Sequence, residues 1–227
     1  MVLHNKPVIR NNIIPIIMQE LAQEKEELIA TGDWVNLGLP SGLLWATRNV
    51  GATSPEDYGD YFAWGETQPK EFYAWSTYRY TNDSYHQLTK YCDKSYYGNN
   101  GFTDNLTTLQ SGDDVANVNW FGGARIPTKE EWKELIYHTT AQWTTRSGVN
   151  GLLLIGSNGN SLFLPAAGHR RGSSLYCAGS NGFYWSSSLN TTGGPNFAWD
   201  FCFHSIRQYM YNDSRYRGFP VRAVHQY

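Results

Sequence analysis

Acid, thiol and imidazole side chains alternate with aromatic ones along residues 197–204, and no other stretch of the chain is better placed to do chemistry. The aromatic residues occupy every second position: Phe197, Trp199, Phe201 and Phe203. In a strand they would share one face, which we expect to be core. The opposite face would carry side chains of no common chemistry: Ala198, Asp200, Cys202 and His204.

The same mixture continues downstream, where large, charged and small residues follow one another: Tyr209, Tyr211, Asp213, Ser214, Tyr216 and Arg217. A regular strand framework that displays irregular side chains is typical of recognition surfaces. An ordinary solvent-facing surface also tolerates any mixture of side chains. Exposed aromatic residues and a thiol are costly choices for an idle surface, so the pattern favours a binding face.

The three cysteines, Cys92, Cys177 and Cys202, are odd in number and lack the spacing of a metal site. Free thiols are expected, with one disulfide bond left open. The acidic pair Asp113-Asp114 fits either a structural ion or the cap of a turn, and capping is favoured. We therefore expect no metal and no other cofactor.

Composition excludes several classes of function. The chain has 227 residues, 41% hydrophobic residues and a net charge of −2, and it carries no basic stripe or DNA-binding motif, so nucleic acid is not an expected partner. No segment is long and apolar enough to insert into a membrane, and no secretory signal precedes residue 13. Aromatic residues make up 15% of the chain, beside 22 glycines, which favours a loop-rich fold with aromatic packing.

Residues 1–32 differ from the rest and predict a helix, with Pro15 in its first turn and Gly32 at its end. Its apolar positions form a short stripe: Ile14, Ile17, Leu21 and Leu28. Two interpretations stay open. The helix packs on its own domain, or it serves in docking or homo-oligomerisation, because so short a stripe needs a partner surface.

From Asp33 onward the pattern predicts an α+β domain. Two strands, 34–37 and 43–50, flank a turn, and residues 58–101 are expected to wrap the core as long ordered loops. Residues 106–120 predict a weak helix and residues 126–139 a strong one, with a Thr128–Glu131 capping box and a buried stripe of Trp132, Leu135 and Ile136. Strands follow around the Asn158-Gly159 turn and again over residues 183–224.

Several motifs together carry a family resemblance. RIPTKEEWKELI, LPAAG, GFYWSSS and GFPVRAV occur in this order. In this arrangement the chain resembles the C-type lectin fold of the formylglycine-generating-enzyme branch. WVNLGLPSGLLWATRNVGA and YGDYFAWGET are similar to Bacteroides-type domains of that branch. The resemblance covers Asp33 to Val224 and implies a C-type lectin-like domain over residues 33–227.

Within that group the chain resembles the variable proteins of diversity-generating retroelements, in which a reverse transcriptase errs at adenines and rewrites the end of the target gene. The resemblance implies a variable region over about residues 169–219. Most of its positions hold residues reachable from an asparagine codon by changes at adenines. The implied ligand-binding positions are His169, Arg171, Tyr176, Cys177, Phe197, Asp200, Cys202, His204, Arg207, Tyr209, Tyr211, Asp213, Ser214, Tyr216 and Arg217.

The resemblance implies a receptor-binding protein or adhesin rather than an enzyme. Its partner would be a protein or glycan on a target cell surface, and the protein would be displayed on a phage tail or otherwise outside the cell. Tyrosines such as Tyr209 would anchor the partner, and arginines such as Arg207 would supply bidentate contacts. A helix over residues 13–30 would add avidity by oligomerisation.

Three alternatives remain at this stage. A formylglycine-generating-type enzyme would need a cysteine pair, but Cys177 and Cys202 lie at expected variable positions. A calcium-dependent lectin would need several oxygen ligands from a Glu-Pro-Asn-type loop and a Trp-Asn-Asp-type strand. Here Gly194-Pro195-Asn196 and Tyr211-Asn212-Asp213 match these motifs only in part, and the first lacks the carboxylate. A carbohydrate-binding or structural domain of the same fold, without diversification, is the third.

Overall fold

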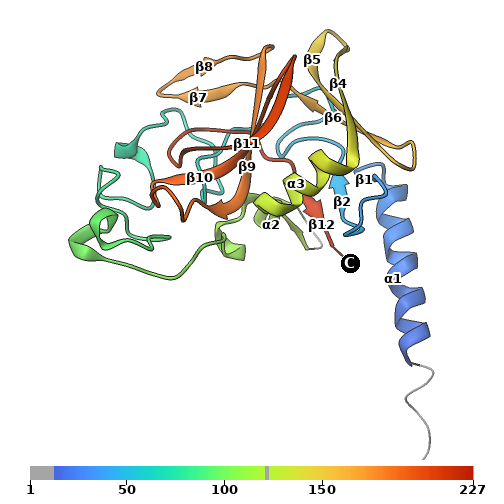
Figure 1. The fold of residues 1–227 in the computed structure, drawn as a ribbon, viewed down its shortest axis with the longest axis horizontal. Helices are drawn as coiled ribbons and strands as arrows, with labels where there is room; N and C mark the ends of the chain where they lie inside the picture. Colours follow the sequence, from blue (N-terminus) through green and yellow to red (C-terminus); the bar gives the residue numbers. More distant parts are fainter. Residues whose placement is uncertain (1–12, 121–122, 227) are drawn as a thin grey trace, which may run out of the picture.

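The computed structural model describes residues 13–120 and 123–226, and it combines several small antiparallel sheets with a few helices (Figure 1). This mixture confirms the predicted α+β class. The helices are α1 (Ile13–Ala30), α2 (Val115–Asn119) and α3 (Lys129–His138). Single 3-10 turns lie at Trp75–Thr77, Ser95–Tyr97, Asn99–Gly101 and Ser111–Asp113.

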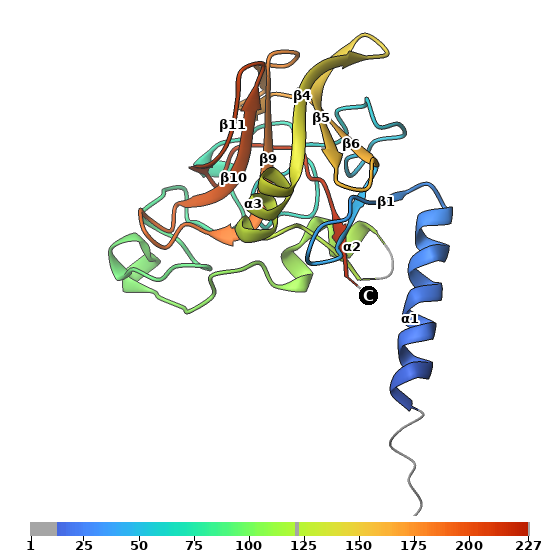
Figure 2. The same cartoon turned by 45° about the vertical axis from the view of Figure 1, so that its right-hand side comes forward.

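Helix α1 projects from the body of the molecule, as Figures 1 and 2 show from two sides. Its C-terminal end lies beside β1 (Trp34–Asn36), where Ile29 packs on the core. The helix stops before Gly32, which adopts a φ of +77°, as the sequence predicts. Ile14 and Ile17 of the predicted stripe are exposed and Leu21 is half-buried, while the Leu28 side chain lies outside the described residues.

A four-stranded sheet joins the two ends of the domain that follows α1, in the order β1-β2-β12-β3. Its other strands are β2 (Leu44–Ala46), β12 (Val224–His225) and β3 (Ala124–Arg125). Strand β12, near the end of the chain, thus inserts between β2 and β3. The buried Arg222 side chain, two residues before β12, donates to the Ala46 carbonyl at the end of β2 and to the Asn49 side chain in the turn that follows. These bonds hold the two segments together.

Two three-stranded meanders form the upper half of the molecule. One contains β4 (Thr139–Arg146), β5 (Val149–Gly156) and β6 (Ser161–Pro165), and the other contains β9 (Asn181–Leu189), β10 (Phe197–His204) and β11 (Arg207–Ser214). Strand β10 is the stretch with alternating aromatic residues, and β11 is part of the mixed segment that follows it. Strand β4 is not predicted from the sequence, because its exposed and half-buried positions follow no clean alternation.

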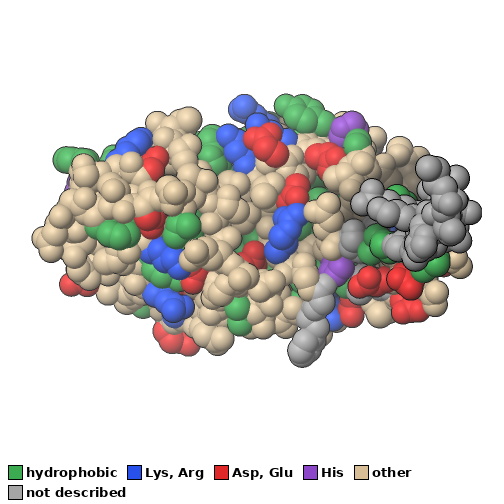
Figure 3. Space-filling model, turned by 90° about the horizontal axis from the view of Figure 1, so that it is seen from below, with side chains coloured by type: hydrophobic (Ala, Val, Ile, Leu, Met, Phe, Trp, Pro, Cys, Tyr) green, Lys and Arg blue, Asp and Glu red, His purple; other side chains and the backbone are tan. Residues whose placement is uncertain are grey.

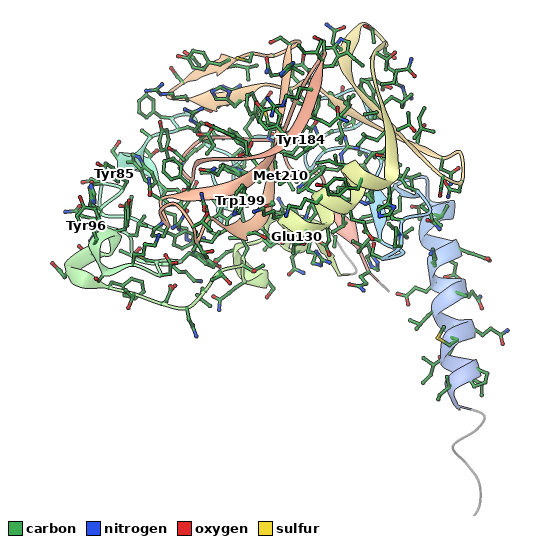
Figure 4. All side chains as sticks on the ribbon, in the orientation of Figure 1. Tyr85, Tyr96, Glu130, Tyr184, Trp199 and Met210 are labelled. Carbon is green, nitrogen blue, oxygen red and sulfur yellow. The ribbon has the colours of Figure 1, made fainter. Side chains whose placement is uncertain are left out.

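Helix α3 covers one face of the β9-β10-β11 sheet. Thr128 and Glu131 form the predicted capping box at its start, and Trp132 stacks on Phe201 with ring centroids 4.9 Å apart. Tyr184 of β9 and Met210 of β11 lie on this same side (Figure 4). The predicted helix over residues 106–120 shrinks to α2, which Asp114 caps by accepting from Ala116 and Asn117, so capping is the observed role of that acid.

The long segment 58–101 wraps the core as ordered loops, as predicted. Its aromatic side chains enter the main core cluster, with Phe62, Trp64 and Tyr73 all nearly fully buried. Arg215, just after β11, fixes these loops to the sheet: its guanidinium donates to the Tyr78 hydroxyl and to the carbonyls of Lys90, Tyr91 and Pro195. The loop region is therefore a structural part of the same domain.

Candidate functional site

Seven of the fifteen predicted ligand-binding positions share one face of the β9-β10-β11 sheet. Opposite residues of antiparallel strands point to the same side, and the register pairs Asp200 with Tyr211, Cys202 with Tyr209, and His204 with Arg207. We call this side, together with the hairpin described next, the candidate face. It lies opposite the face covered by α3, but β10 is buried on both faces over residues 200–203, so its alternation does not divide a buried face from an exposed one as predicted.

A short hairpin, β7 (His169–Arg171) and β8 (Ser174–Tyr176), extends the candidate face beyond the sheet. Arg170 and Gly218 exchange two backbone hydrogen bonds, of 2.8 and 3.0 Å, which join the hairpin to the segment after β11. The His169 ring stacks on Tyr176 at 5.6 Å between centroids and meets the edge of Phe183 on β9. Three separate stretches of the predicted variable region thus converge.

The structure corrects the expected exposure of several positions. Five of the predicted side chains are exposed, namely Arg171, Tyr176, Cys177, Arg207 and Tyr211. Others are half-buried, namely His204, Tyr209, Tyr216 and Arg217. Four are buried, namely His169, Asp200, Cys202 and Asp213. The buried four form the floor of the candidate face: His169 lies among the rings of Tyr176, Phe183 and Phe219, and Asp213 is paired with Arg217.

Phe197 and Ser214 do not belong to the candidate face. They pair with each other at the far end of β10 and β11, and their place in the alternation puts them on the side of Trp199 and Phe201. Both are only half-buried, as is Trp199, so the aromatic row is core only at Phe201 and Phe203. The Lys129 ammonium lies 3.2 Å from the centre of the Trp199 ring at the start of α3.

Charge on the floor of the candidate face is nearly neutralised. Asp213 and Arg217 form a two-pronged ion pair, with Nε–Oδ1 at 2.9 Å and Nη1–Oδ2 at 3.0 Å. Asp200 is fully buried and, within the part of the chain that the structure describes, neither of its carboxyl oxygens has a hydrogen-bond partner. Burial, followed by the nearby Asp213, raises the pKa of Asp200 well above its ordinary value and favours the neutral acid.

Two other floor residues are also held neutral. Burial, reinforced by Arg217 and Arg171, lowers the pKa of His169 to about 4. Burial raises the pKa of Cys202 to about 11, and its thiol contacts the Tyr209 hydroxyl at 3.6 Å. The charges that this face presents to a partner are therefore those of its exposed arginines. In contrast, the view of the molecule from below shows acidic and basic side chains interspersed (Figure 3).

An open groove of about 650 Å³ lies at the edge of the candidate face. We call it the aromatic groove. One wall carries Arg171 and Tyr176 of the hairpin with Tyr216, and the other carries Phe72 and Trp75 of the long loop. The Trp75 and Tyr216 rings meet at 5.1 Å between centroids. Pockets of this size with mostly aromatic walls are usual for ligand sites.

Sequence reasoning missed Phe72 and Trp75, which lie about a hundred residues before the hairpin. The Phe72 ring is half exposed and Trp75 is partly exposed, although both lie in a segment expected only to wrap the core. Sequence distance hides this neighbourhood, because it depends on the bridge between Tyr73 and Gly172. The aromatic excess of that segment was the only available signal.

The arrangement offers no evident catalytic or metal centre within residues 13–120 and 123–226. No group of three or more His, Cys, Asp or Glu side chains there could hold a metal ion. Cys92, Cys177 and Cys202 are free, as expected, with Cys177 exposed and Cys202 buried. The two segments that resemble calcium-binding motifs of lectins do not offer a free carboxylate. In Tyr211-Asn212-Asp213 the Asp213 carboxylate is paired with Arg217, and in Gly194-Pro195-Asn196 the Asn196 side chain is buried. None of the helices described could span a membrane.

Comparisons with known proteins add one finding. A family model described as a domain of unknown function, DUF8237, matches residues 143–224. The matched segment runs from β4 to the start of β12 and contains the whole candidate face, but neither α1 nor the loop with Phe72 and Trp75. No curated protein and no solved structure matches the chain.

Proposed function

We propose that this chain is a ligand-binding protein of the receptor-binding or adhesin type, whose candidate face is diversified by a retroelement. The supporting observation is spatial: ten of the fifteen positions assigned to the variable region by resemblance lie on one side of the sheet or on its adjoining hairpin. Three more, Cys177, Tyr216 and Arg217, directly follow these strands. Alternation within a strand puts the positions of that strand on one side, but it does not by itself bring the hairpin beside the segment after β11, as the hydrogen bonds between Arg170 and Gly218 do. A diversified face also accounts for its lack of common chemistry.

The fold proposed for the chain is C-type lectin-like. The mixed architecture, the late strand β12 inserted beside β2, and the long loop region packed on the sheet are compatible with it. Such a framework suits diversification, because the residues that hold it together are separate from the candidate face. Arg215, Arg222 and Trp132 make their contacts in the core, so the exposed side chains can change without loss of these bonds.

The proposal predicts how related isolates differ. Sequencing this locus and its neighbours in sibling isolates should find a near-identical repeat that differs only opposite adenines, at codons for candidate-face residues such as Arg171 and Tyr211. Protein differences should fall on the candidate face and spare Arg215 and Trp132. Siblings that keep the candidate face unchanged, with no repeat and no reverse transcriptase gene nearby, would reject diversification.

Helix α1 is proposed to join several copies of the chain on one displayed particle. Ile14, Ile17 and Met18 are exposed and share one side of this projecting helix, and an apolar stripe of this kind gains stability by packing against a second helix. Light scattering should give an oligomer mass for the full chain and a monomer mass after deletion of residues 13–30. An unchanged mass would remove oligomerisation from the proposal.

A further inference from the structure

We propose that the aromatic groove binds an acidic, partly apolar peptide segment of a protein partner, and that Phe72 and Trp75 form its constant wall. This inference rests on the proposed binding function and deepens it. Neither residue belongs to the predicted variable region. The groove would therefore combine a wall that stays the same in every variant with a wall that diversification changes.

The two walls are held in a fixed relation. Tyr73 and Gly172 exchange two backbone hydrogen bonds, of 2.9 and 2.8 Å, directly between the loop and the hairpin. Gly172 has a φ of +58°, and a Cβ there would come within 3.5 Å of the Phe72 ring. The Thr77 hydroxyl donates to the Phe72 carbonyl at 2.6 Å and closes the loop behind the ring. A groove built this way loses little entropy when it binds.

The constant wall faces outward although it is apolar. Half of the Phe72 side chain is exposed, and Trp75 is packed by Tyr216 on one side and Tyr78 on the other. Aromatic rings that are rigid and partly exposed supply binding energy without preference for one partner sequence. Variable residues on the facing wall, such as Tyr176, would then decide which partner fits.

Charge selects an acidic occupant. Arg171 lines the groove and is exposed, and Arg207 is exposed elsewhere on the candidate face. Both acids of the face are buried: Asp213 is paired with Arg217, and burial favours the neutral form of Asp200. The face is thus positive in a chain whose net charge is −2. A guanidinium in this position binds a carboxylate with two parallel hydrogen bonds.

The balance of polar and apolar groups favours a peptide over a glycan. A sugar presents several hydroxyl groups that each need a directed partner, whereas the non-aromatic polar side chains lining this groove are Arg171, Ser173 and Ser174, beside five aromatic rings. A peptide that carries aliphatic or aromatic side chains next to an Asp or Glu matches this surface. Its apolar side chains would cover the rings while its carboxylate meets Arg171.

The test is selection from a displayed library of random linear peptides on the immobilised full-length chain. Enriched peptides should contain Asp or Glu beside aromatic or large aliphatic residues, and raising the salt concentration should weaken them. Phe72→Ser and Arg171→Glu should each weaken binding about tenfold or more. The matched controls Tyr137→Ser and Lys133→Glu, on α3, should leave binding unchanged, because that helix covers the opposite face of the sheet.

Other outcomes overturn the inference. Enrichment of neutral or basic peptides, or peptides unaffected by Phe72→Ser and Arg171→Glu, would show that the groove is not the site. If those peptides are instead lost with Tyr209→Ala and Tyr211→Ala, the proposed function stands and only the groove assignment fails. If no peptide is enriched and the chain binds only to a glycan array, the ligand of the groove is a glycan and the peptide assignment is wrong. Invariant sibling sequences would instead reject the diversification on which the proposed function depends.

Discussion

Two buried ionisable residues, Asp200 on β10 and Arg215 just after β11, have opposite hydrogen-bonding environments. Both are completely buried. Arg215 donates four hydrogen bonds and lies over the rings of Trp64, Tyr78 and Tyr91. Neither carboxyl oxygen of Asp200 has a hydrogen-bond partner among the described residues. Hydrogen bonds within the protein replace those to water for Arg215, but not for Asp200.

This difference separates the framework from the candidate face. Leaving a buried polar group without a partner costs stability, and a position under selection for stability would rarely keep an acid there. Arg215 lies in the sequence between Ser214 and Tyr216, so position in the chain does not explain the contrast. Under the proposed function, Asp200 is a residue that diversification sampled and that persists because the framework tolerates its cost. The contrast leads to four predictions.

The largest effect is expected at Arg215. Arg215→Met should lower the free energy of unfolding by about 3 kcal/mol or more, because it removes the donor for the Tyr78 hydroxyl and for the carbonyls of Lys90, Tyr91 and Pro195, which now accept from the guanidinium. Urea denaturation measures this change. Arg207→Met, at an exposed arginine of the candidate face, is the control and should change stability by less than about 0.5 kcal/mol. Equal losses of stability in the two variants would mean that Arg215 and the arginines of the candidate face do not differ in structural role.

Asp200→Leu should have the opposite sign. Removing the partnerless carboxyl is expected to stabilise the chain by about 1–3 kcal/mol at pH 7. The raised pKa means that the unfolded chain releases this proton at a lower pH than the folded chain, so stability falls as pH rises above about 4. The gain from Asp200→Leu should therefore shrink as the pH is lowered towards 4. A destabilised variant would mean that Asp200 is a framework residue.

How much of this could be predicted from sequence depends on the range of the signal. Local signals were sufficient for α1, for the capping box at Thr128 and for the alternation that puts Phe201 and Phe203 in the core. The burial of Asp200 could not be predicted, because it depends on tertiary packing that the alternation within one strand does not encode. The same limit hid the wall formed by Phe72 and Trp75. Strand β4 was missed because its pattern of exposure is irregular.

His169, another buried residue of the candidate face, should make the stability of the chain depend on pH. Its pKa falls from an ordinary value near 6.5 to about 4 in the folded chain. Between these values the unfolded chain binds more protons, so stability falls as pH drops from about 6.5 to 4. His169→Phe should remove about 1 kcal/mol of that loss at pH 4.5. Thermal unfolding across this range measures how stability changes with pH, and the sign of this change is opposite to that expected for Asp200. If the variant keeps the pH dependence of the wild type, His169 is not its source.

The smallest effects are expected at exposed positions of the candidate face. Tyr211 is 51% exposed and Ile206, at the tip between β10 and β11, is 89% exposed. Tyr211→Asn and Ile206→Asn should each change the free energy of unfolding by less than about 0.5 kcal/mol, because neither removes a buried contact. Phe203→Asn, in the core on the opposite face of β10, is the matched control and should cost about 3 kcal/mol or more. Because both kinds of position occur in one hairpin, comparable losses at Tyr211 and Phe203 would mean that the candidate face is part of the framework and is not free to vary.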